Sequence, residues 1–87
     1  MYVIMTYDVG VERVNKVLKI GRKYLTWVQN SVLEGEISNP NLQRLKNQIS
    51  KTINKNHDTV TFYMLRTTKY LKKETIGTTK GEPTTIL

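Results

Sequence analysis

Near its start the chain reads Tyr2-Val3-Ile4-Met5-Thr6-Tyr7-Asp8, an apolar run that stops at a carboxylate. β-Branched and aromatic residues fill the run, as is typical of a buried strand. Val9-Gly10 and a basic stretch with helical spacing follow. An acidic residue at the carboxyl end of a strand, before a turn into a helix, is a common position for ligand and metal sites. Asp8 is therefore the candidate functional residue, with capping of the next helix as the alternative.

Length and composition limit the classes of protein that the chain can belong to. The chain has 87 residues and a formal net charge of +7, and it lacks cysteine, which excludes disulfides and thiolate chemistry. One small domain of this size is only marginally stable alone, so a homodimer is expected. No apolar run approaches the ~18 residues that cross a bilayer, and the start enters a strand without the regions of a signal peptide. We expect a cytoplasmic protein that does not bind membranes.

The remaining pattern predicts an α+β fold of the ferredoxin-like type, in the order β-α-β-β-α-β, with a four-stranded antiparallel sheet and two helices on one face. Helical spacing of apolar residues over 11–25 predicts a first helix of about 14 residues. Residues 25–29 and 32–37 predict a hairpin. Asn39-Pro40, with Asn39 as the cap, predicts a second helix that runs to about residue 55. Alternation over residues 59–66 predicts the last strand.

The other face of this sheet is expected to be uncovered, and a second copy stacked on it would give a two-fold dimer. Residues 69–76 are expected to add a short strand, so that residues 1–76 form the domain and residues 77–87 a tail. Pro83 and the terminal Ile86-Leu87 suggest a tether with an apolar end that docks on a partner. A frayed chain end is the alternative.

The first helix carries a cluster of cations with no acid among them: Arg13, Lys16, Lys19, Arg22 and Lys23. Such a surface favours polyanionic partners such as nucleic acid. A generic solvated face is the alternative, although such faces usually mix charges of both signs. One hard oxygen ligand, Asp8, beside these cations suggests a Mg²⁺-assisted site for a phosphate-bearing substrate. A two-fold dimer would bring two copies of Asp8 to one groove.

Four segments carry a family resemblance. They are Tyr7-Asp8 at the end of the first strand, the basic helix, residues 28–35 in the hairpin, and Asp58 before the strand that contains Phe62-Tyr63. Over about residues 1–66 the chain resembles the small CRISPR-associated endoribonuclease family, the non-integrase subunit of the spacer-acquisition complex. The resemblance implies a homodimeric ferredoxin-like protein. It also implies either a Mg²⁺-dependent nuclease on single-stranded RNA or double-stranded DNA, or a scaffold clamped between two integrase dimers.

Residue by residue, the resemblance assigns Tyr7 and Asp8 to the family's catalytic strand-end pair, with Asp8 as the metal ligand. Arg13 lies near the usual basic position of the first helix. Val14 stands where a second cation is often found, and Leu33 where an aromatic residue is often found. In a scaffold the basic faces would hold duplex phosphates, and the tail or edge strands would engage the integrase.

A third class of function is a generic RNA-binding domain. Such a domain would stack bases on exposed aromatic side chains of its sheet, for which Tyr7, Trp27 and Tyr63 are the candidates. Catalytic triads find little support, because His57 is the single histidine and its place between a helix and a strand is typical of a solvated loop residue.

Overall fold

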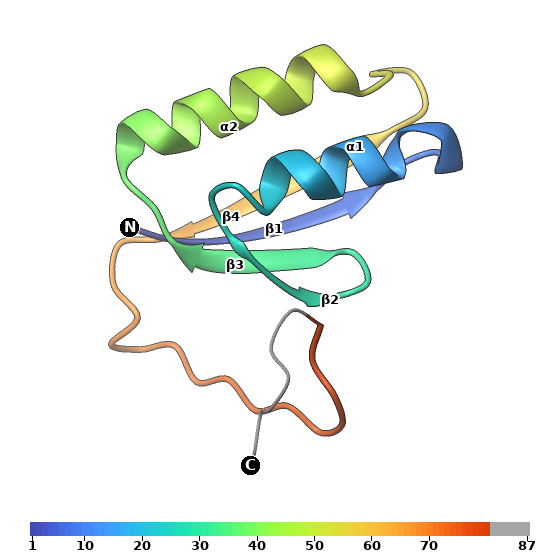
Figure 1. Ribbon diagram of the computed structural model, residues 1–87. Helices are drawn as coiled ribbons and strands as arrows, with labels where there is room; N and C mark the ends of the chain where they lie inside the picture. Colours follow the sequence, from blue (N-terminus) through green and yellow to red (C-terminus); the bar gives the residue numbers. More distant parts are fainter. Residues whose placement is uncertain (81–87) are drawn as a thin grey trace.

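The computed structural model describes residues 1–80 and places two helices on one face of a four-stranded sheet (Figure 1). The strand order is β2-β3-β1-β4, and every neighbouring pair is antiparallel. The arrangement confirms the predicted ferredoxin-like α+β fold. In chain order the elements are β1 (Tyr2–Asp8), α1 (Val11–Gly21), β2 (Thr26–Gln29), β3 (Val32–Glu36), α2 (Asn39–Thr52) and β4 (Thr59–Leu65).

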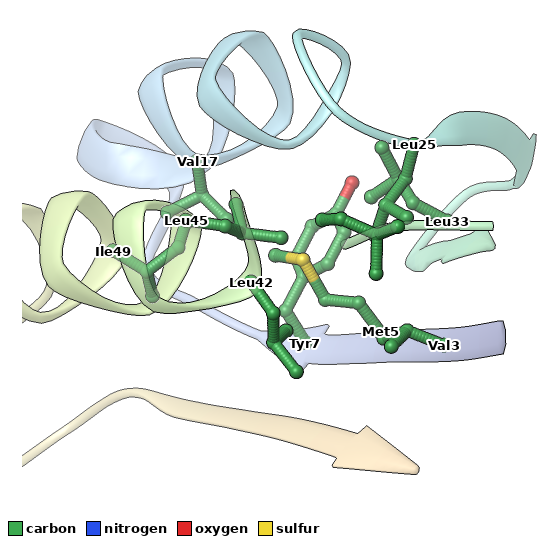
Figure 2. Close-up of a cluster of buried hydrophobic side chains, with 10 residues drawn as sticks. Val3, Met5, Tyr7, Val17, Leu25, Leu33, Leu42, Leu45 and Ile49 are labelled. Carbon is green, nitrogen blue, oxygen red and sulfur yellow. The ribbon is translucent and has the colours of Figure 1, made fainter. Parts of the chain in front are cut away.

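β1 is a central strand, and the alternation of its side chains separates the two faces of the sheet. Met5 pairs with Leu33 of β3 on one side and with Phe62 of β4 on the other. Val3, Met5 and Tyr7 are buried on the side of the helices, as alternation over a strand requires. The core that they form, drawn in Figure 2, also contains Val17, Leu25, Leu33, Leu42, Leu45 and Ile49.

α1 is shorter than its apolar spacing predicts, because it ends at Gly21 and a turn precedes β2. Val17 and Gly21 face the core, whereas Val11, which the spacing places on the apolar side, is 86% exposed in the first turn. Gly21 allows the helix to approach β3 closely, since a Cβ there would lie 3.0 Å from Leu33 Cδ2. A side chain at position 21 would therefore require Leu33 to shift within the core.

The cap of α2 lies one residue earlier than the sequence predicts. Ser38 is the N-cap, and its Oγ accepts a hydrogen bond from the Asn41 amide at 3.3 Å. The prediction of Asn39 as the cap is therefore wrong: Asn39 is the first helical residue, and Pro40 lies in the first turn, where no amide donor is required. The helix ends at Thr52, because Ile53 is already extended.

No strand follows β4 within residues 1–80, so the expectation of a short strand over 69–76 is wrong. The segment crosses the sheet on the face opposite the helices (Figure 1). Lys73 Nζ lies 2.9 Å from Glu34 Oε1, and the Lys80 amide donates to the Val28 carbonyl at 2.8 Å. The segment is thus held by isolated contacts and not by the regular hydrogen bonds of a strand. It covers part of the sheet face that the sequence predicted to be open.

The boundary between a domain over residues 1–76 and a tail over residues 77–87 stays a prediction. Pro83 and Ile86-Leu87, the expected docking end, lie outside the described residues. Among the described residues, neither helix has the length and apolar character needed to span a membrane.

Candidate active site and nucleic-acid interface

Asp8 is the last residue of β1, and its side chain is exposed. It pairs with Thr59 at the start of β4. Because Tyr7 points toward the helices, strand alternation directs Asp8 to the opposite face. α1 has Gly10 as its N-cap, and no side chain in the described part of the chain gives it a capping hydrogen bond, so Asp8 does not serve as the helix cap. The carboxylate is therefore available at the edge of the sheet face that carries no helix.

Tyr7 lies in the core (Figure 2), on the other side of β1 from Asp8. Its phenol donates a hydrogen bond to the Asn30 carbonyl at 2.9 Å, which ties the end of β1 to the turn between β2 and β3. Burial raises the pKa of the Tyr7 phenol, so the neutral form is favoured. The structure thus does not bring the phenol and the Asp8 carboxylate together, although the two residues are adjacent in the chain.

The three aromatic residues predicted to stack on RNA bases also lie on different faces of the sheet. Tyr7 and Trp27 pack against the core, and only Tyr63 of the three aromatic candidates is largely exposed. Tyr63 pairs with Ile4 of β1, on the face opposite Tyr7. This distribution argues against a generic RNA-binding sheet, which needs several exposed aromatic rings on one face.

Arg13 is held by Asp58, the residue before β4. Arg13 Nε and Nη2 donate to the Asp58 carboxylate at 2.5 and 3.0 Å. The same carboxylate accepts from the backbone amides of Gly10 at 2.9 Å and Asn54 at 2.8 Å. The hydrogen bonds from Arg13 hold the pKa of Asp58 well below its usual range, even though burial opposes this shift. Sequence reasoning placed Arg13 among the nucleic-acid-binding cations and gave Asp58 no role.

The other predicted cations lie on the outer surface of the helical layer. Lys16, Lys19 and Lys23 are exposed and line a hollow of about 320 Å³ that Thr52 of α2 borders on its other side. The Arg22 guanidinium lies 5.5 Å from the centre of the Trp27 ring, which fixes its position beside β2. Four of the five cations therefore form one basic face, which we call the α1 basic face: Lys16, Lys19, Arg22 and Lys23.

The donor set for a metal is small. Among residues 1–80 no group of three or more His, Cys, Asp or Glu side chains lies close enough to hold a metal ion together. Asp8 supplies one exposed carboxylate per chain. Mg²⁺ commonly keeps several waters and binds through one or two carboxylates, so two copies of Asp8 related by a two-fold axis would fit its needs.

The chain thus combines a ferredoxin-like sheet, an exposed carboxylate at the end of a central strand and a basic helix on the opposite face of the sheet. The family model described as CRISPR associated protein Cas2 matches residues 1–73, and the chain belongs to that family. The resemblance seen in the sequence is thus confirmed.

Relatives and solved structures agree with this assignment. The chain is 52% identical over 87 residues to a CRISPR-associated endoribonuclease Cas2 of Dictyoglomus turgidum, covering 100% of both chains. It is 54% identical over 82 residues to the protein of the same name from Thermotoga maritima, covering 94% of each. A crystal structure of Cas2 superposes with a TM-score of 0.83 at 39% identity, covering 100% of this chain and 98% of that one. The Streptococcus pyogenes Cas2 structure at pH 6.5 gives 0.78 at 31% identity, covering 88% and 100%.

Proposed function

We propose that this protein acts in CRISPR spacer acquisition as a homodimeric, Mg²⁺-dependent endonuclease, with RNA as the first substrate to test. The observation that carries the proposal is the exposed Asp8 carboxylate at the end of a central strand, on the sheet face opposite the helices. Relatives that match the whole chain are named endoribonucleases, which supports RNA as the substrate. A cytoplasmic location accords with this role.

In the proposed site, the Asp8 carboxylates of the two subunits would together hold Mg²⁺, which would polarise a phosphoryl oxygen and activate a water. Two carboxylates at one groove repel each other, so the metal also relieves their repulsion. The buried Tyr7 phenol contributes by fixing the end of β1 through Asn30. The α1 basic face binds phosphates away from the bond that is cleaved.

The test is Asp8→Asn, which keeps the size of the side chain and removes the charged ligand. Mg²⁺-dependent cleavage of single-stranded RNA and of double-stranded DNA should fall by orders of magnitude, while sedimentation equilibrium still reports a dimer. Glu36→Gln is the matched control, because Glu36 is exposed and pairs with Tyr2 at the opposite end of β1. Equal cleavage by the unaltered protein and Asp8→Asn would remove the enzymatic proposal.

A non-catalytic scaffold is the second candidate, and one observation favours it. The α1 basic face lies on the helical layer, whereas Asp8 belongs to the opposite face of the sheet. Phosphate binding therefore needs no contact with Asp8, and a protein that bridges integrase dimers and holds a protospacer duplex could use the basic face alone. In this case Asp8→Asn supports normal spacer acquisition, and replacement of Lys16 and Lys19 by Gln abolishes it.

A further inference from the structure

Asp58 is a buried carboxylate that the proposed chemistry does not use. Its side chain has a relative exposure of 0%. Thr59 pairs with Asp8, so Asp58, one residue earlier, points to the other face of the sheet, where it contacts Gly10 and Arg13. Asp58 therefore cannot share a metal ion with Asp8 of its own chain. Any influence of Asp58 on the site must pass through the residues that it holds.

The residues bound to Asp58 belong to the three segments that surround the end of β1. Gly10 lies in the turn that leaves β1, two residues after Asp8. Arg13 belongs to the first turns of α1, and Asn54 to the turn between α2 and β4. The carboxylate accepts four hydrogen bonds from these groups, which satisfies a charge that would otherwise be costly to bury. One side chain thus joins the turn that follows Asp8 to the start of α1 and to the turn between α2 and β4.

Gly10 shows how closely this arrangement is packed. A Cβ at position 10 would lie 2.6 Å from Arg13 Nη2 and closer still to Glu12 Oε1, so any other residue here would force the ends of these two side chains to move. The Gly10 φ of −56° is ordinary, so the preference for glycine comes from the close approach of the Glu12 and Arg13 side chains and not from backbone conformation.

We propose that Asp58, Arg13 and Gly10 form a positioning clamp that sets the Asp8 carboxylate for metal binding, and that Arg13 is not a nucleic-acid contact. The inference rests on the proposed role of Asp8. The clamp acts because, within residues 1–80, only the Asp58 side chain holds the Gly10 amide and no side chain caps the start of α1. Loss of the clamp frees the turn and moves Asp8 relative to its copy across the two-fold axis.

Three substitutions test the clamp by different means. Asp58→Asn removes the charge, and Arg13→Gln removes the bidentate donor. Gly10→Ala crowds the guanidinium together with the Glu12 carboxylate, while Asp58 and Arg13 both remain. Each should lower kcat by about 10- to 100-fold, the scale of a small misplacement of a catalytic group. RNA affinity measured by anisotropy without metal should not change. Asp58→Asn with Arg13→Gln should be no worse than the more damaging single variant, because the two act as one unit.

Two further measurements separate positioning from general loss of stability. Hydrogen exchange at the Gly10 amide should accelerate in Asp58→Asn, and Mn²⁺ binding followed by electron paramagnetic resonance should weaken. Leu42→Ala is the matched control, since Leu42 is buried in the first turn of α2, at the end of the sheet where β1 begins. At an equal fall in melting temperature, Leu42→Ala should keep its kcat and its Mn²⁺ affinity.

The inference is overturned if Arg13→Gln weakens RNA binding as replacement of Lys16 does. It is also overturned if Leu42→Ala loses as much kcat as Asp58→Asn, or if Asp58→Asn cleaves normally while Asp8→Asn is inactive. Normal cleavage by Asp8→Asn is a different result, because it overturns the proposed function as well as the inference that rests on it.

Discussion

The α1 basic face should determine how steeply nucleic-acid binding depends on salt. Lys16 and Lys19 are exposed and form no salt bridge within residues 1–80, so both are available to phosphates. Arg13 has its guanidinium occupied by Asp58. The test therefore compares a double variant, Lys16→Gln with Lys19→Gln, with the single variant Arg13→Gln.

The expected size follows from the number of contacts removed. Each neutralised phosphate contributes about 0.9 to the slope of log K against log salt for duplex DNA, and about 0.7 for single strands. Two lost contacts lower the slope by about 1.8 or about 1.4. Between about 50 and 200 mM salt, the unaltered protein should lose about 12-fold more duplex affinity than the double variant. Arg13→Gln should leave the slope unchanged.

Fluorescence anisotropy of a labelled duplex and a labelled single strand over a salt series measures the slope. Lys69→Gln with Lys72→Gln is the control, because it removes the same charge from exposed positions outside α1. The reasoning is refuted if this control lowers the slope as much as the α1 pair does, because binding would then follow net charge. A slope that falls in Arg13→Gln would refute the assignment of Arg13 to Asp58.

Three further predictions concern pH and substrate length. Because the pKa of Asp58 is lowered in the folded state, the ionised carboxylate stabilises the fold above the unfolded Asp pKa of about 4, and this stabilisation is lost as the pH falls below that value. In Asp58→Asn, the free energy of unfolding measured with urea should therefore depend less on pH in the acid range. Burial, and next the hydrogen bond to Glu34, raise the pKa of Tyr2. The neutral Tyr2 phenol therefore stabilises the fold below the unfolded Tyr pKa of about 10, and this stabilisation is lost as the pH rises beyond that value. In Tyr2→Phe, the free energy of unfolding should depend less on pH in the alkaline range. Replacement of both Lys16 and Lys19 by Gln should raise KM for a long RNA but not for a dinucleotide, because a dinucleotide is too short to reach the α1 basic face from Asp8. An equal rise in KM for both substrates would place those lysines at the cleaved phosphate.

The fold could be predicted from sequence because its determinants are local and periodic. The strand from Tyr2 alternates, α2 repeats its leucines at helical spacing, and a glycine at position 21 stands where α1 approaches the sheet. The error at the start of α2 occurred where two neighbouring residues were equally suited to be the cap. Ser38 and Asn39 are both good caps, and only the backbone conformation decides between them.

The site was less accessible to sequence reasoning because its contacts are not local. Arg13 reads as one more cation of a basic helix, and only the fold reveals its partner 45 positions away. Tyr7 and Asp8 read as a pair because they are adjacent, although adjacent residues of a strand face opposite sides. An acidic residue just before β4, at the same end of the sheet as Asp8, was the available signal for Asp58.

The segment after β4 limits where a second copy can approach Asp8. Its residues line a hollow with Ile4, Val28, Val32 and Glu34, so they cover the half of the free face formed by β2 and β3. Asp8 lies outside that hollow, beside the exposed Thr59 at the start of β4. A two-fold contact made by β1 and β4 can therefore bring two Asp8 carboxylates together without displacing the segment. In the proposed dimer, a contact centred on β3 would instead have to break the Lys73–Glu34 ion pair.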